Sequence, residues 1–453
     1  MSLAPPSLRL TVSILHVFPA ESSPCFENLK NFPCHRRPRL LGFIPALFRA
    51  VVLRMSKVLY VGAGAPWVGG AGYLVRQWTT LRALARAASL HLALFDLPPD
   101  APPPPFACEI TPLPLRQKAG GGKVGAAIGD LFNSLPRLVR KVDVAAARAA
   151  LGQLDLSAFD AIVAYRIEFA YAAGVLGKAR LILDVDDPEH LRWRRRMEAG
   201  KVAIDWRTAR DLDKLRRFET EAVARAQQAW VCQENDRRAF ERGEVVVVPN
   251  GVAVPAEVER GPTEPVVLLL GNFAAGPGSP NTDALRWFGA EVWPRVKALV
   301  PAAECRVVGK ISEDLRGLVG ATAGMRATGF VESLATAFGE ARVSVAPLRF
   351  GTGTRVKILD AWAHACPVIS TTAGADGLPI AAGENIVIAD DPQEFAGGCA
   401  ALLNDAGRAA AIGAAGRRTA EEQFDAAAIE RRLVERFRAF LAERNRSGER
   451  VHP

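Results

Sequence analysis

Two basic side chains and a carboxylate follow a short glycine-rich segment in the second half of the chain. Gly351 and Gly353 separate an apolar run from Arg355, Lys357 and Asp360. The apolar run is typical of a buried strand and the residues after position 354 of a helix, so the cations are expected at a helix N-terminus. Backbone N–H groups and two cations suit a nucleotide diphosphate, and Asp360, one turn past Lys357, could accept ribose hydroxyls. We interpret this segment as a phosphate-binding βαβ unit, with an ordinary βα turn and a solvated basic face as the alternative.

Short apolar runs alternate with helical patterns along most of the chain. In the first half, strands are expected at 58–63, 91–95, 161–164, 181–185, 229–232 and 245–248. In the second half, they are expected at 266–270, 305–308, 326–328, 343–346, 367–371 and 385–389. The alternation predicts an α/β protein with two doubly wound, Rossmann-like domains that face a ligand-binding cleft.

Composition shifts suggest where these domains begin and end. We predict an N-terminal extension at 1–54, a first Rossmann-like domain at 55–254 and a proline-containing linker at 255–265. A second Rossmann-like domain is expected at 266–425, followed by a C-terminal helix with a tail at 426–453. The extension holds seven Lys or Arg and two Glu, so it accounts for +5 of the net charge of +9. We interpret it as a disordered or non-native segment. A basic anchor on a membrane surface, from Arg39 to Arg54, is the alternative.

The overall composition excludes several classes of function. With 49% apolar and 23% charged residues, the 453-residue chain is an ordinary globular protein. Outside the extension the charge is only mildly basic and lacks interleaved aromatic residues, so no nucleic-acid partner is expected. The seven cysteines form no C-x-x-C pair, which favours reduced thiols in the cytoplasm. No apolar stretch is long enough to cross a membrane, which leaves peripheral contact with the inner membrane surface as the alternative to a purely cytoplasmic location.

The segment from Gly351 to Leu378 resembles the C-terminal domain of family-4-type (group 1) glycosyltransferases. The resemblance rests on Gly-x-Gly-Thr-Arg-x-Lys, on a following Pro-Val strand, and on the acidic-Gly-Leu sequence Asp376-Gly377-Leu378. Asp360 takes the place of the second of two acidic residues in that family, whereas Thr352 stands at the first and has no charge. Farther upstream, the glycine loop that contains Gly69 and Gly70, and the Val-Pro-Asn-Gly-Val sequence at 248–252, resemble other parts of the same family.

This resemblance implies a GT-B fold whose C-terminal helix packs back on the body. It implies that the N-terminal domain at 55–254 binds the acceptor and that the C-terminal domain at 266–425 binds the nucleotide-sugar. It also implies transfer of a sugar from a nucleotide diphosphate-sugar to a glycan, lipid-linked or small-molecule acceptor, with retention and without a metal or other cofactor. Arg355 and Lys357 would act in catalysis by stabilising the departing diphosphate. The implied nucleotide-sugar-binding residues are Gly69, Gly70, Gly351, Thr352, Gly353, Arg355, Lys357, Asp360, Asp376, Gly377 and Leu378.

Charged residues at two strand ends of the first half are candidates for the acceptor side. Arg166 and Glu168 follow one strand, and Asp186 and Asp187 follow the next. Each pair could bind acceptor hydroxyls or form structural salt bridges, for example with the arginines at 192–196. A metal site on Asp184 and Asp186 is an alternative that we do not favour.

Two other functions stay open at this point. A GT-B nucleotide-sugar epimerase would bind the nucleotide-sugar and need no acceptor. A non-catalytic nucleotide-sugar-binding partner would explain the uncharged Thr352. In every case the loop 271–280 contains no Lys or Arg, so Arg355 and Lys357 would have to supply most of the positive charge near the phosphates.

Overall fold

A computed structural model describes residues 56–68, 72–117, 133–200, 205–258, 264–276, 278–331, 333–351, 353 and 355–447. The expectations for residues 1–54, for Gly69 and Gly70, and for Thr352 lie outside these residues. Residues 55–453 form one compact unit with two lobes, each built on a parallel sheet.

The first lobe contains a seven-stranded sheet in the order β3-β2-β1-β6-β7-β8-β9, with parallel neighbours throughout. Its strands are β1 (Lys57–Ala63), β2 (Ser89–Phe95), β3 (Cys108–Leu113), β6 (Ala161–Tyr165), β7 (Leu181–Asp186), β8 (Gln228–Val231) and β9 (Val245–Val247). Its helices are α2 (Gly72–Ala85), α4 (Arg137–Arg140), α5 (Ala145–Leu151), α6 (Ile167–Ala173), α7 (Glu189–Glu198), α8 (Trp206–Arg225) and α9 (Glu234–Arg237). The strand order reverses direction between β1 and β6, and ligands of open α/β sheets bind beside such a point.

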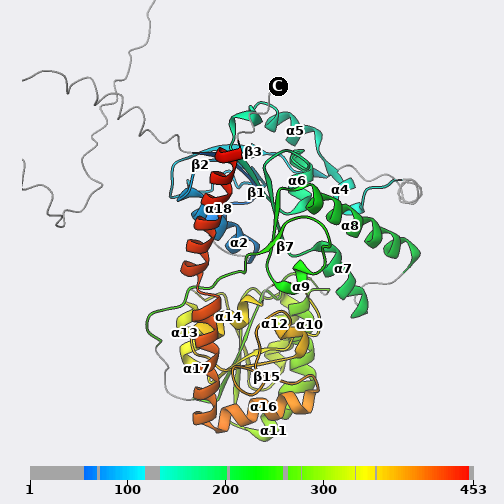
Figure 1. Ribbon diagram of the computed structural model, residues 1–453. Coiled ribbons are helices and arrows are strands. Elements are labelled where there is room, and N and C mark those ends of the chain that lie inside the picture. Colours follow the sequence, from blue (N-terminus) through cyan, green and yellow to red (C-terminus); the bar gives the residue numbers. More distant parts are fainter. Residues whose placement is uncertain are drawn as a thin grey trace, which may run out of the picture. The chain divides into compact units, whose positions relative to one another are not determined.

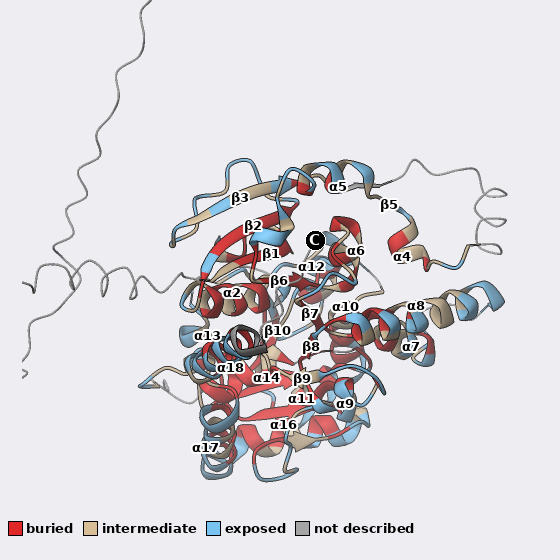
Figure 2. Cartoon of the chain, turned by 45° about the horizontal axis from the view of Figure 1, so that its top comes forward, coloured by how far each residue is buried: buried red, intermediate tan, exposed pale blue. Residues whose placement is uncertain are grey.

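Side chains of this sheet alternate between two apolar layers, as the pleat of a strand requires. Leu59 and Val61 of β1 pack with α5, α6 and α8, whereas Val58 and Tyr60 pack with α2 and with a helix from the C-terminal end of the chain. Figure 2 shows the sheet buried between these helices. Both faces are covered, which explains why the strands read as continuous apolar runs.

The second lobe repeats this plan with six parallel strands in the order β12-β11-β10-β13-β14-β15. The strands are β10 (Val266–Leu270), β11 (Glu304–Val308), β12 (Met325–Gly329), β13 (Val343–Ala346), β14 (Val368–Ser370) and β15 (Val387–Ile388). The helices are α10 (Pro280–Trp287), a π-helical turn (Phe288–Val292), α11 (Trp293–Leu299), α12 (Glu313–Ala321), α13 (Leu334–Glu340), α14 (Val356–Ala363), α15 (Thr372–Ala375), α16 (Pro392–Asn404) and α17 (Ala406–Gln423).

The last helix, α18 (Ala426–Ser447), returns to the first lobe and packs beside α2 (Figure 1). Leu433 and Phe437 lie in the apolar layer that also contains Tyr60 of β1. Arg82 of α2 forms an ion pair of 3.0 Å with the buried Glu430. The predicted GT-B architecture, with a C-terminal helix on the body, is therefore confirmed.

The structure also contains strands that the sequence analysis missed. β3 lies at the edge of the first sheet, and only Leu113 of its six residues is buried. A short antiparallel pair, β4 (Arg116–Gln117) with β5 (Val142–Asp143), lies outside both main sheets. An edge strand with exposed side chains has no continuous apolar run, so it lacks the signal by which the central strands were found.

Candidate active site

The glycine-rich segment and its two cations form the connection between β13 and α14. Gly351 and Gly353 have φ values of +131° and +82°, a backbone conformation that residues with a Cβ adopt only under strain. Arg355 is the residue immediately before α14, and Lys357 lies in the first turn of this helix. The local strand–loop–helix arrangement expected from the sequence is therefore present.

Arg355 is buried, with only 7% of its surface exposed. Its Nη2 donates to the carbonyl oxygen of Ala373 at 3.0 Å. Burial lowers the pKa of the guanidinium, against the opposing effect of Asp187 and Asp376. The alternative of a solvated basic face is therefore wrong for Arg355, whose guanidinium packs against α15.

Lys357 is half-buried. Its Nζ donates to Oδ1 of Asn281 at 2.6 Å, and Asn281 lies in the first turn of α10. Burial, followed by the positive charge of Arg355, lowers the pKa of Lys357 to about 7. Two neighbouring cations that are partly removed from water attract negative charge, so this arrangement suits an anionic ligand.

Asp360 lies one turn farther along α14. Burial raises the pKa of its carboxyl group to about 7. His364, at the end of this helix, donates from Nδ1 to the Asp360 carbonyl oxygen at 2.8 Å and stacks on Phe338 at 5.1 Å. His364 is thus a packed histidine, as its apolar sequence neighbours suggest.

The acidic-Gly-Leu segment contacts the first lobe. Asp376 pairs with Arg195 of α7, with Nη1 and Oδ2 2.7 Å apart, and lies 3.4 Å from the amide of Asn235. Gly377 has a φ of +82°, and the position of a Cβ there would be 1.7 Å from Oε1 of Gln233. Only glycine fits at this close approach.

Arg195 was not singled out from the sequence, yet it joins two loops of the second lobe. Its Nη1 also donates to the carbonyl oxygen of Gly351 at 3.2 Å. One guanidinium from α7 therefore contacts both the glycine-rich loop and Asp376. Its place in an arginine-rich helix gave no indication of these contacts, because solvated helix faces have the same composition.

Asp184 has a structural role rather than a metal-binding or acceptor-binding one. It is fully buried and forms a bidentate ion pair with Arg76 of α2, the shortest distance being 2.7 Å. Arg76 also donates to the carbonyl oxygen of Val248 and, at 3.2 Å, to Oδ1 of Asn250, both in the segment that leads to the second lobe. The charged partner of Asp184 therefore comes from α2 and not from the arginines at 192–196.

Asp186 lies at an irregularity of β7, with a φ of +60°. Its carboxylate accepts hydrogen bonds from Tyr165 at 2.8 Å and from Cys232 at 2.9 Å. Arg166, whose Nη2 is 3.6 Å from Asp186, also lies 3.7 Å from Glu168. Burial acts to raise the pKa of Asp186, but the nearby arginines and the donated hydrogen bonds outweigh it and lower the pKa. The structure thus brings three of the acceptor-side candidates together as one charged cluster.

Asp187 connects this cluster to the glycine-rich loop. Its Oδ2 would lie 2.2 Å from a Cβ placed on Gly353, so the carboxylate rests against the loop backbone. Its buried Oδ1 has no hydrogen-bond partner among the described residues. Burial, followed by the charges of Asp186 and Asp236, raises the pKa of Asp187 to about 7. The sequence analysis did not predict Asp236 as a site residue. Burial raises the pKa of Asp236 to about 6, and its Oδ2 also has no hydrogen-bond partner among the described residues.

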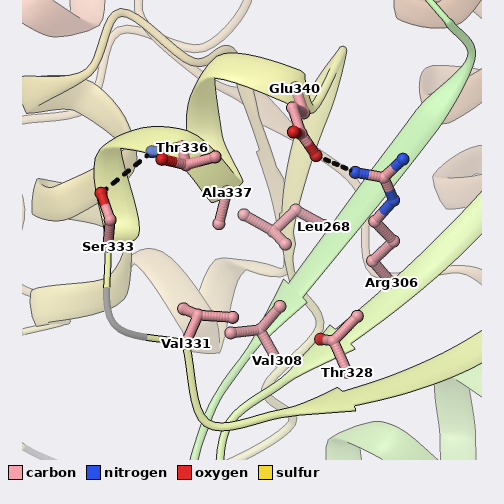
Figure 3. Close-up of a pocket in the computed structure, with 9 residues that line it drawn as sticks. All are labelled: Leu268, Arg306, Val308, Thr328, Val331, Ser333, Thr336, Ala337 and Glu340. Atoms are coloured by element: carbon pink, nitrogen blue, oxygen red, sulfur yellow. Dashed lines mark hydrogen bonds and ion pairs between the residues drawn. The ribbon is translucent and has the colours of Figure 1, made fainter.

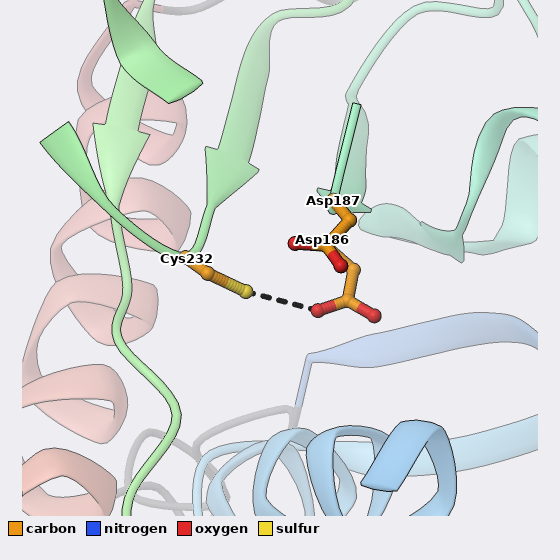
Figure 4. A group of neighbouring side chains, drawn as sticks. All are labelled: Asp186, Asp187 and Cys232. Atoms are coloured by element: carbon orange, nitrogen blue, oxygen red, sulfur yellow. Dashed lines mark hydrogen bonds between the residues drawn. The ribbon is translucent and has the colours of Figure 1, made fainter. Parts of the chain in front are cut away.

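Asp186, Asp187 and Cys232 are close enough to share one metal ion, with one ligand atom from each within 4.8 Å of the others (Figure 4). The Cys232 thiol donates to Asp186, and burial raises its pKa well above the ordinary value. Asp186 is already compensated by Arg166 and Tyr165. These residues fit a hydrogen-bonded carboxylate cluster better than a metal site, because a metal would need the thiolate and would compete with a guanidinium.

Two of the cavities among the described residues involve the second lobe. One of about 450 Å³ is lined by residues of both lobes, among them Gln233, Asn235, Gly377 and Leu378. The other, of about 410 Å³, lies within the second lobe between β10, β11, β12 and α13 (Figure 3). Apolar side chains such as Leu268 line it, and Arg306 pairs with Glu340 at its edge. Because it lies on the α13 side of the sheet and contains none of the predicted site residues, we treat it as separate from the candidate active site.

None of the helices in the described part of the chain is long and apolar enough to cross a membrane.

Comparison with known proteins adds the class of protein. Residues 264–405 match the sequence family of glycosyl transferases group 1. Comparison with curated protein sequences gave no significant match.

Solved structures with the same fold are numerous. HepE (Alr3699) from Anabaena, solved with UDP and glucose, is 16% identical with a TM-score of 0.55, and the match covers 85% of this chain and 99% of HepE. Sucrose-phosphate synthase from Thermosynechococcus elongatus is 19% identical with a TM-score of 0.63, covering 86% of this chain and 100% of that one. TarM from S. aureus, solved with fondaparinux, α-GlcNAc-glycerol and UDP, is 14% identical with a TM-score of 0.51, covering 66% of this chain and 59% of TarM.

The two Rossmann-like lobes and these structural matches define a GT-B fold. The second lobe, which carries Arg355 and Lys357, matches the glycosyl transferases group 1 family. The expected enzyme class is therefore confirmed, while the roles of individual residues stay predictions.

Proposed function

We propose that this protein transfers a sugar from a nucleoside diphosphate-sugar to a hydroxyl group of a glycan acceptor, with retention and without a metal ion. The observation that carries the proposal is the cation pair formed by the buried Arg355 and the half-buried Lys357 beside Gly351 and Gly353. A diphosphate would neutralise both charges, and it gains negative charge as the sugar leaves. The pair therefore stabilises the transition state more than the ground state.

Asp360 would bind the ribose of the nucleotide. It lies on α14, one turn beyond Lys357, and a carboxylate can accept hydrogen bonds from two neighbouring hydroxyl groups. The burial that raises its pKa to about 7 makes such hydroxyl donors favourable, because they would stabilise the ionised form.

The acceptor would bind on the side of the first lobe, near Arg166, Glu168, Asp186 and Asp187. These side chains lie at the carboxyl ends of β6 and β7, and Asp187 touches the glycine-rich loop. The unpartnered Oδ1 of Asp187 could accept a hydrogen bond from an acceptor hydroxyl close to the phosphate site. HepE and TarM support the substrate class, since they were solved with UDP and with glucose or glycan ligands.

The cytosolic location expected from the cysteines also stays a prediction. Cys232, Cys305, Cys366 and Cys399 are buried free thiols. A reducing compartment would keep them in this state.

A thermal-shift series with UDP, GDP, ADP and their monophosphates tests the binding part of this proposal, because a ligand of the folded state raises the melting temperature. We expect one diphosphate to raise it more than its monophosphate does. The corresponding nucleotide-sugar is then incubated with and without glycan acceptors. A glycosylated product supports the proposal, an isomerised sugar formed without acceptor would show an epimerase instead, and absence of any nucleotide effect would refute the proposal.

A further inference from the structure

Two consecutive arginines of α7 extend from the first lobe to the loops of the second. Arg195 is engaged by the Gly351 carbonyl oxygen and by Asp376. Arg196 extends to a different loop, where its Nη2 lies 3.1 Å from the position that a Cβ would take on Gly278. Neighbouring residues of one helix thus contact two separate loops of the other lobe.

Gly278 belongs to the connection between β10 and α10, in which residues 271–280 include no Lys or Arg. Asn281, in the first turn of α10, holds Nζ of Lys357. Arg196 and Lys357 therefore approach the same loop–helix junction, one from each lobe. Arg196 supplies there the positive charge that the loop itself lacks.

The guanidinium of Arg196 is positioned but not fully hydrogen-bonded. Its Cζ lies 5.5 Å from the ring centroid of Trp193, and Trp193 is held by a hydrogen bond of 3.0 Å from Nε1 to Glu189. The buried Nε of Arg196 has no acceptor among the described residues. A buried N–H group of a cation is costly to leave unpaired, so the structure favours an anionic acceptor at this place.

We propose that Arg196 binds the phosphates of the nucleotide-sugar from the opposite lobe and completes the cation set formed by Arg355 and Lys357. This inference rests on the proposed function and adds a specific binding residue to it. The planar guanidinium can donate two parallel hydrogen bonds to phosphate oxygens. Since the nucleotide would then contact both lobes, its binding stabilises the arrangement in which α7 touches the loop at Gly278.

The test measures the affinity of the full-length protein for the nucleoside diphosphate that gives the largest thermal shift among UDP, GDP and ADP. The variants are Arg196→Ala and Arg196→Lys, with Arg194→Ala as the matched control. Arg194 lies on the same helix, is 56% exposed, and forms a surface ion pair of 3.7 Å with Glu198. The affinity for the corresponding nucleoside, which has no phosphates, is measured in parallel, and both affinities are determined by calorimetric titration.

For Arg196→Ala we expect diphosphate binding to weaken roughly ten- to hundredfold, as for loss of a charge-assisted hydrogen bond, while nucleoside binding stays within about twofold. Arg196→Lys should recover part of the loss, and Arg194→Ala should bind like the wild type. If Arg196→Ala unfolds, the ratio of diphosphate to nucleoside affinity is measured with Arg196→Lys and Arg196→Gln, and a larger ratio for lysine than for glutamine supports the inference.

Two negative outcomes are distinguishable. If the wild type binds none of the nucleoside diphosphates, the proposed function fails and this inference with it. If the wild type binds one of them but Arg196→Ala binds it equally well, or loses diphosphate and nucleoside affinity in the same proportion, the role of Arg196 alone is overturned.

Discussion

Asp187 of the first lobe lies against Gly353 of the second, so close that a Cβ on Gly353 would be 2.2 Å from Oδ2 of Asp187. The acidic strand end and the glycine-rich loop are thereby in direct contact. Glycine is required at position 353 for two reasons. Its φ is +82°, and a side chain there would overlap the Asp187 carboxylate. This contact unites the two parts of the candidate site.

Gly353→Ala is expected to reduce turnover at least tenfold, because the loop must move away from Asp187 or accept both backbone strain and steric overlap. Gly383→Ala is the matched control, since Gly383 has a φ of +83° and no atom within 4 Å of its Cβ position. Both variants carry the same backbone strain of about 1 kcal/mol, so thermal unfolding should shift in both. Steady-state kinetics should show the loss of turnover only for Gly353→Ala. Equal turnover in the two variants would contradict a role of the Asp187 contact.

Lys357→Ala and Arg355→Ala are each expected to lower kcat by about ten- to a thousandfold, in the range found for removal of one stabilising group at a developing negative charge. The effect on kcat should exceed that on KM, because the diphosphate gains charge as the sugar leaves. Asp360→Ala should instead raise KM for the nucleotide-sugar, since a ribose contact changes little during the reaction. Near-normal turnover of both cation variants would locate the phosphate site elsewhere.

The affinity for the nucleoside diphosphate should fall as the pH rises above about 7. The pKa of Lys357 is lowered to about 7 by burial and by Arg355, so free protein loses this charge above that pH, and binding of an anion must restore the proton. The decrease can reach about tenfold per pH unit for one proton. Asp187 ionises in the same pH range, and its negative charge would also weaken binding of the diphosphate. Ionisation of Asp360 would instead strengthen its hydrogen bonds with the ribose.

Lys357→Arg isolates the contribution of the lysine to this pH dependence, because a guanidinium stays charged throughout the range. Calorimetric titrations from pH 6 to pH 9 should give a flatter profile for this variant than for the wild type. Identical profiles would assign the pH dependence to the carboxyl groups.

Asp184→Ala is expected to destabilise the protein by about 3–5 kcal/mol, because it leaves the buried guanidinium of Arg76 without its charged partner. Asp314→Ala is a suitable control, since its ion pair with Arg286 of 2.8 Å is exposed on both sides. That change should cost about 1 kcal/mol or less. Denaturant unfolding measures both values, and a comparable small loss in the two variants would show that Asp184 is dispensable for stability.

Turnover should be unaffected by excess EDTA. Positive side chains surround the proposed phosphate site, and they can take over the charge neutralisation that a metal ion provides in other enzymes. An assay before and after chelation, followed by addition of magnesium or manganese, measures this directly. Activity that disappears and is restored by a metal would instead assign a metal to Asp186, Asp187 and Cys232.

The sequence by itself determined the two lobes and the loop that carries Arg355 and Lys357. Central strands such as β10 and β13 are buried on both faces, so they form short apolar runs in the sequence. Gly351, Gly353 and the helix pattern that follows them are also close together in the sequence, so the loop could be recognised within a short window. The edge strand β3 could not, because only one of its residues is buried.

The tertiary structure alone decided which charged residues meet. Arg76 and Asp184 are 108 residues apart, and Arg195 and Gly351 are 156 residues apart, so no local pattern connects them. The same holds for the burial of Arg355, which depends on packing around the helix start rather than on its position in the helix. Contacts of this kind arise where the two lobes pack together, and this packing places Asp187 beside Gly353 and Arg196 beside Gly278.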